Sequence, residues 1–139
     1  MGCDIHMHLE VKIDNQWEHY GAPSVSRNYE LFEKLGARGD IENAMVTPKG
    51  IPADATKLTA LDYKSWEGDA HTASWLSKEE IMVLEGWLKG LPGDFLSHGL
   101  EHVILKTYLF GNSFTGPFRY PEENCFNIQD VRFVFWFDN

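Results

Sequence analysis

Hydrophobic and polar residues alternate without a break along the first part of the chain, residues 3–13. One side of this stretch is apolar: Cys3, Ile5, Met7, Leu9, Val11 and Ile13. The other side is polar: Asp4, His6, His8, Glu10 and Lys12. Because successive side chains of a strand point to opposite faces, this alternation predicts a half-buried strand with one core face and one reactive face.

Patterns near the two ends of the chain predict further strands. Asp14-Asn15 favours a turn, and the alternation over residues 16–20 predicts a returning strand that completes an N-terminal hairpin. Residues 131–139 are apolar enough to form a central strand that is covered on both faces.

Three stretches between these strands predict helices. Residues 27–35 have a short helical pattern with apolar residues on one side. Ser77 and Glu80 form a capping box, which predicts a helix that begins at Lys78. A further helix is expected over about residues 95–110, where apolar residues recur at helical spacing.

Between the first and second of these helices, residues 40–72 show no sustained period and contain several prolines and glycines. Long irregular segments in compact domains often carry function. The sequence therefore predicts a single α+β domain over residues 1–139. Its small antiparallel sheet would consist of the N-terminal hairpin and the C-terminal strand, packed with about three helices and this long irregular central segment.

Composition and charge narrow the classes of partner. The formal net charge is −9, from 21 acidic and 12 basic residues, which argues against a long nucleic acid because its backbone requires clustered Lys and Arg. Two cysteines, Cys3 and Cys125, are too few for a disulfide framework. No segment has the length and hydrophobicity of a membrane span. We expect a cytoplasmic protein without a membrane partner.

Two Asp-x-His elements, Asp4/His6 and Asp69/His71, carry the strongest candidate chemistry. If they converge, one His can act as general base and another as general acid, each oriented by an Asp. Alternatively, a divalent metal ion could be held by some of these groups, with Asp4, His6, His8 and His71 as candidate ligands. Both schemes suit hydrolysis of a phosphodiester or pyrophosphate. The plain structural alternative is that each Asp bonds a nearby His or caps a turn.

Candidate ligand-binding residues are basic or aromatic. Arg27, Arg38 and Arg119 can hold phosphate groups through paired donors, although a solvated helix face is the alternative for the first two. Flat rings that can stack on a base come from segments without a regular pattern: Trp66, Trp75, Phe118 and Tyr120.

Several short pieces of the chain stand out together: residues 1–6 (Met-Gly-Cys-Asp-Ile-His), 27–32, 50–52, 69–76 and the ending Phe-Trp-Phe-Asp-Asn at 135–139. Their combination resembles a family of small uncharacterised proteins encoded mainly by tailed bacteriophages and prophages, and the match runs nearly end to end. The resemblance implies no activity, fold or ligand. It implies a setting, the host bacterial cytosol, where small phage accessory proteins often act against host defence.

These observations support three hypotheses of function. The leading one is a phage counter-defence protein that hydrolyses a phosphate-bearing nucleotide signal, with Asp4, His6, Asp69 and His71 as its reactive cluster. The first alternative is a sponge that binds such a signal without cleaving it. The second is an inhibitor that binds a host protein directly. A homo-oligomer is left open, because a sheet this small can pair across a dimer.

Overall fold

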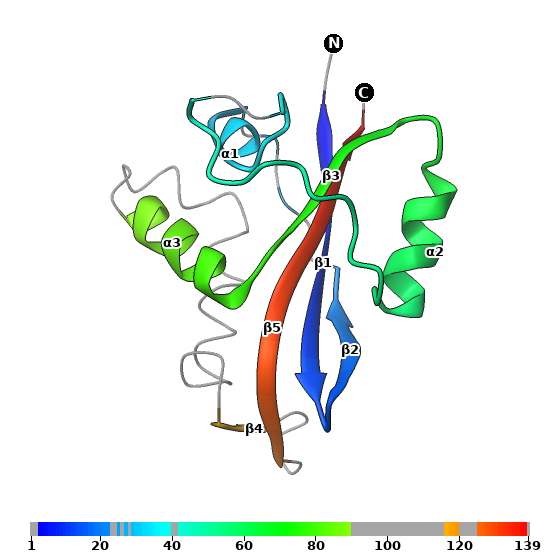
Figure 1. Cartoon of the computed structure of the whole chain (residues 1–139), viewed down its shortest axis with the longest axis vertical. Coiled ribbons are helices and arrows are strands. Elements are labelled where there is room, and N and C mark those ends of the chain that lie inside the picture. The colour runs from blue at the N-terminus through cyan, green and yellow to red at the C-terminus, as the bar shows by residue number, and fades with distance from the viewer. Residues whose placement is uncertain are drawn as a thin grey trace.

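The computed structural model describes residues 3–22, 25, 27, 29–39, 42–89, 116–119 and 125–138, with only the backbone described for 88, 89, 116–119 and 125–128. Its centre is a five-stranded antiparallel sheet with the order β2-β1-β5-β3, in which β4 also pairs with β5 (Figure 1). The strands are β1 (Asp4–Ile13), β2 (Gln16–Gly21), β3 (Ala70–Leu76), β4 (Gly116–Arg119) and β5 (Cys125–Asp138).

The N-terminal hairpin forms as its turn chemistry predicts. Asp14 and Asn15 have φ angles of 52° and 64°, so both central residues of the two-residue turn are left-handed. Asp and Asn tolerate this conformation better than other residues with a side chain, and it matches the twist of the flanking strands. Ile13 consequently pairs with Gln16, which sets the register of β1 against β2.

The C-terminal strand β5 is central, as its apolar sequence predicts. It pairs with β1 on one side and with β3 on the other. Every apolar residue from Val131 to Phe137 is fully buried. Helices α1 (Tyr29–Lys34) and α3 (Lys78–Lys89) cover one face of the sheet, and α2 (Lys57–Ser65) lies against the other (Figure 1).

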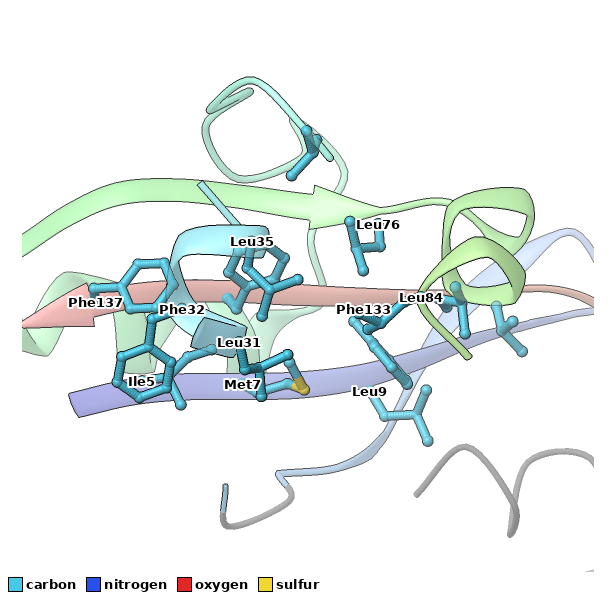
Figure 2. Close-up of a cluster of buried hydrophobic side chains, with 14 of the residues drawn as sticks. Ile5, Met7, Leu9, Leu31, Phe32, Leu35, Leu76, Leu84, Phe133 and Phe137 are labelled. Carbon is cyan, nitrogen blue, oxygen red and sulfur yellow. The ribbon is translucent and has the colours of Figure 1, made fainter. Parts of the chain in front are cut away.

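The main hydrophobic core lies between the sheet and helices α1 and α3. The apolar face of β1 enters this core as predicted, and Phe32 of α1 packs edge-on against Phe137 of β5 at 5.3 Å between ring centroids. Figure 2 shows how these side chains interdigitate: Ile5, Met7, Leu9, Leu31, Phe32, Leu35, Leu76, Leu84, Phe133 and Phe137. Burial of each such side chain contributes about 1.5–3 kcal/mol.

Helix α3 begins at the predicted capping box. The Ser77 backbone N–H donates to Glu80 Oε1 over 2.9 Å, and the Glu80 N–H donates to Ser77 Oγ over 3.2 Å. These bonds satisfy donors that the first helical turn leaves unpaired. Ile81 and Leu84 of this helix then reach the core and have no exposed surface.

The central segment is more regular than the sequence predicts, because it contains α2 and the beginning of β3. Helix α2 lacks the expected apolar stripe: Leu58 and Leu61 are 59% and 54% exposed, while Thr59 is fully buried. A helix that buries a polar residue and exposes its leucines gives no amphipathic signal. The sheet therefore has more strands than the predicted hairpin and C-terminal strand.

The predicted α+β fold in a single domain is confirmed for the described residues. Their three helices are α1, α2 and α3, whereas the helix predicted over residues 95–110 lies outside the described part of the chain. Among the helices that are described, none combines the length and the hydrophobicity needed to cross a membrane.

Candidate functional site

Helix α2 covers part of the polar face of β1, so this face is not exposed to water along its whole length. His8 is 5% exposed and Glu10 is fully buried, although the alternation alone predicts an open polar face. Burying such groups is costly unless each finds a hydrogen-bond partner. Helix α2 and the neighbouring strands supply those partners.

Glu10 ties β1 to the beginning of α2. Its Oε2 atom accepts hydrogen bonds from the Thr56 N–H at 2.9 Å, the Thr56 hydroxyl at 2.6 Å and the Thr59 hydroxyl at 2.7 Å. Its Oε1 accepts from Arg132 Nε at 2.7 Å. Burial would raise the pKa of Glu10, but the bonds from Thr56, Thr59 and Arg132 outweigh burial and hold that pKa below its usual value. The carboxylate also places negative charge at the helix N-terminus, where the macrodipole favours it.

Arg132 continues this network from β5. Its Nη1 and Nη2 atoms donate to the carboxylate and the backbone carbonyl of Asp54, over 2.8 and 3.1 Å. Its guanidinium also lies 3.9 Å from the centroid of the Trp17 ring, in a cation–π contact. The bonds of Glu10 and Arg132 therefore fix α2 against the sheet.

A pocket of about 370 Å³ opens beside the other half of β1, and we call it the β1 pocket. Among the described strands, β2 pairs with β1 only from Leu9 onward, so residues 4–8 have β5 on one side and this pocket on the other. The residues that line it come from β1, from α2 and from the chain after β2: Asp4, Ile5, His6, Met7, His8, Ala22, Val25 and Asp62.

His6 has the geometry of a general base in this pocket. Its Nε2 atom lies 2.5 Å from Asp138 Oδ2, and because an ionised carboxylate only accepts, Nε2 carries the proton. Nδ1 of the neutral ring is then an unprotonated acceptor, and no side chain in the described residues bonds to it. The ring lies 4.2 Å from the Trp66 ring and 5.9 Å from that of Trp136, which limit its rotation.

His8 lines the same pocket but has both ring nitrogens engaged. Nε2 bonds to Asp62 Oδ2 at 2.7 Å and Nδ1 lies 2.8 Å from His19 Nε2. Burial, and then the neighbouring His8, lower the pKa of His19, which keeps that ring neutral at neutral pH. His8 therefore holds α2 and β2 together and has no nitrogen left for a substrate.

Asp4 lines the β1 pocket and is bonded to Arg27. Arg27 donates through Nε and Nη2 to both carboxylate oxygens of Asp4, over 2.7 and 3.1 Å. The bond from Arg27 lowers the pKa of Asp4, so this carboxyl group is ionised at neutral pH and cannot act as a general acid. Arg27 is the one predicted phosphate-binding residue that contacts, among the described residues, a side chain lining this pocket.

The two Asp-x-His elements do not converge, which corrects the predicted single cluster of Asp4, His6, Asp69 and His71. His6 pairs with Trp136 in the sheet, whereas His71 pairs with Phe137, and adjacent residues of β5 point to opposite faces. His71 consequently lies on the α1 side of the sheet. Asp69 is exposed in the turn between α2 and β3.

The other predicted ligand residues are dispersed. Arg38 lines a pocket on the α1 side, together with His71. The Trp75 ring is covered by the Lys49 ammonium at 4.0 Å from its centroid, so that face is unavailable for a base. Only the backbone is described for Phe118 and Arg119. Tyr120 lies outside the described residues.

The donor set proposed for a metal ion, Asp4, His6, His8 and His71, is likewise not assembled. His8 has no free nitrogen, Asp4 is bonded to Arg27 and His71 is on the opposite face. Across the described ranges, no group of three or more His, Cys, Asp or Glu side chains is arranged to hold an ion. These residues do not fit a metal-dependent mechanism.

Sequence reasoning missed Asp62, Asp138 and His19. Asp138 is two residues from Trp136, the partner of His6, so pairing the two apolar ends of the chain as antiparallel strands would have brought it close. The two-residue turn likewise places His19 opposite Glu10 and near His8. No sequence pattern pointed to Asp62, because helix α2, which carries it, has no amphipathic pattern.

Neither the family models nor the curated proteins nor the solved structures that we searched contain a match to this chain.

Proposed function

We propose that this chain is a phage counter-defence hydrolase that cleaves a phosphate-bearing nucleotide signal in the β1 pocket. The observation that carries the proposal is the Asp138–His6 pair, a carboxylate-bound imidazole that lines a pocket large enough for part of a nucleotide. An imidazole oriented by a carboxylate is a common general base. The resemblance of the sequence to phage proteins supports the setting in the host cytosol.

In the proposed reaction, His6 Nδ1 takes a proton from a water molecule, and the water oxygen attacks phosphorus as the bond to the leaving oxygen breaks. Asp138 stabilises the imidazolium that forms. No second unbonded histidine lines the described part of the pocket to protonate the leaving group. A phosphoanhydride suits this site better than a phosphodiester, because its leaving phosphate needs no proton.

Charge restricts how such a ligand would lie. The carboxylates of Asp4 and Asp62 repel phosphate but accept hydrogen bonds from ribose hydroxyls and base amino groups. The phosphate would therefore lie toward Arg27, and the Trp66 ring beside His6 offers a surface for stacking.

The second candidate is a sponge that binds the same class of ligand without cleaving it. It is favoured by the fixed positions of His8, Asp4 and Asp62, whose bonds to neighbouring residues make a rigid binding wall. Rigid walls lower the entropic cost of binding, whether or not a reaction follows.

The test is incubation of the pure protein with a panel of cyclic dinucleotides and ADP-ribose-type nucleotides, with and without a chelator, followed by chromatography. We expect product in both conditions, and a loss of roughly 10²- to 10⁴-fold in rate for His6→Gln, which keeps a donor near Asp138 but lacks the base. Nucleotide that is depleted and then recovered intact after heating would identify the sponge instead. Product that disappears with chelator would contradict the metal-free reaction.

A further inference from the structure

A hydrogen-bonded chain of three side chains crosses three elements of the fold. His19 of β2 contacts His8 of β1, and His8 contacts Asp62 of α2, over 2.8 and 2.7 Å. His8, in the middle, is buried, whereas His19 and Asp62 are half-buried. The hydrolase reaction proposed above does not use the contact between the two histidines.

The protons along this chain can be placed from the carboxylate at its end. An ionised Asp62 only accepts, so His8 Nε2 carries a proton. The bond between His8 Nδ1 and His19 Nε2 needs one N–H between these two nitrogens. With both rings neutral, His19 Nε2 donates that proton. With one added proton the bond persists, because either ring can then be the donor.

A second added proton removes the bond between the histidines. Each imidazolium donates from both of its nitrogens, so two N–H groups would face each other across 2.8 Å. Two positive charges this close also repel each other. Burial, and then the neighbouring His8, lower the pKa of His19, which agrees with a second proton that binds only under more acidic conditions.

The charged groups around the pair do not remove this conflict. Glu10 of β1 and Asp62 of α2 both act to raise the pKa of His19, but burial and His8 outweigh them. Glu10 is also neutralised by Arg132 of β5, which donates to it over 2.7 Å. The other titratable side chains beside the pair on this face have their own contacts: His6 with Asp138, and Tyr63 with the Trp136 ring.

We propose that the His8–His19 pair is an acid-sensitive joint, which holds the end of β2 against β1 and releases it when both rings are protonated. β2 is an edge strand of the described sheet, and its register against β1 shifts directly beside His19. Ala22 follows β2 and lines the β1 pocket. Release would therefore loosen one wall of this pocket. Regulation of the pocket rests on the proposed function, whereas the joint itself does not.

The test is amide hydrogen exchange of the full chain without nucleotide, followed by NMR from about pH 7.5 to about pH 5.5 and corrected for the intrinsic exchange rate. Opening of the joint lets one more ring take up a proton. Protection of the β2 amides should therefore fall by up to about tenfold per pH unit below about pH 6.5, the usual pKa of histidine. The β3 amides in the same sample should keep their protection.

His19→Gln is the deciding variant. Its amide can donate to His8 Nδ1 or accept from it but cannot be protonated, so protection of β2 should not depend on pH in this range. Glu18→Gln is the matched control, because it removes an exposed titratable group from the neighbouring position of the same strand. It should show the pH dependence of the wild type.

The proposal is overturned if protection of β2 does not fall in the wild type, if it falls equally in His19→Gln, or if Glu18→Gln abolishes the fall. An equal loss at the β3 amides would indicate global unfolding and would also overturn it. Should His19→Gln fail to fold, ¹⁵N spectra of the wild-type imidazole rings decide: His8 and His19 must take up their protons in two separate steps. Because no turnover is measured, this result is independent of the hydrolase test.

Discussion

At the scale of single residues, hydrogen-bond partners decide what equivalent side chains can do. His6 and His8 stand two residues apart on the same face of β1, and the sequence gives both the same candidate role. The structure leaves one nitrogen of His6 without a bond in the described residues and engages both nitrogens of His8. Alternation could predict their shared face but not their partners, which come from β2, α2 and β5.

Glu10 should make the stability of the fold depend on pH. Because its folded pKa lies below the unfolded value, its contribution is present above the unfolded pKa and is lost as pH falls through the folded pKa. We expect Glu10→Gln to cost about 3–5 kcal/mol of unfolding free energy near neutral pH, since it leaves buried Arg132 without its charge partner. Urea unfolding at about pH 7 and at about pH 3 measures both effects.

The wild type should lose more stability than Glu10→Gln between these two pH values, because the variant has no carboxyl group to protonate at this site. Equal losses in the two proteins would show that Glu10 is not held in its ionised form by the network around α2.

At the scale of elements, sequence reasoning succeeded where a periodic pattern coincided with burial. β1 and β5 bury the apolar residues that their patterns select, and α3 begins at its capping box, so all three were predicted correctly. Helix α2 inverts the rule, since it packs through Thr59 and Asp62 onto a polar strand face. A helix of this kind can be predicted only when the charged residues that it packs against are known.

The packing of α2 through its polar residues leads to a specific prediction for this helix. Thr59→Val has nearly the same shape but removes a hydroxyl donor from buried Glu10, and should cost about 1–3 kcal/mol of unfolding free energy. Leu61→Ala, in the same helix but 54% exposed, should change stability by less than about 0.5 kcal/mol. Chemical unfolding of both variants checks the pair. A larger loss for Leu61→Ala would mean that α2 packs through its leucines.

At the scale of the whole molecule, the sheet separates two sets of polar groups that were predicted from the sequence to form one cluster. The Asp138–His6 pair and the β1 pocket lie on the α2 side, and His71 with Arg38 lies on the α1 side. The separation depends on the register of β3 against β5 and on its shift next to Thr72. Neither feature can be derived from spacing along the chain, because register depends on contacts between distant segments.

We propose that Asp138, and not Asp69, orients His6 as the general base of the proposed hydrolase. The most direct measurement compares nucleotide hydrolysis by Asp138→Asn and Asp69→Asn, two identical substitutions, with that of the wild type. The amide at 138 would donate to His6 Nε2 and reverse its tautomer, so we predict a loss on the order of 10²- to 10⁴-fold, with no loss for Asp69→Asn. Normal turnover by Asp138→Asn, or none by the wild type, would contradict the account.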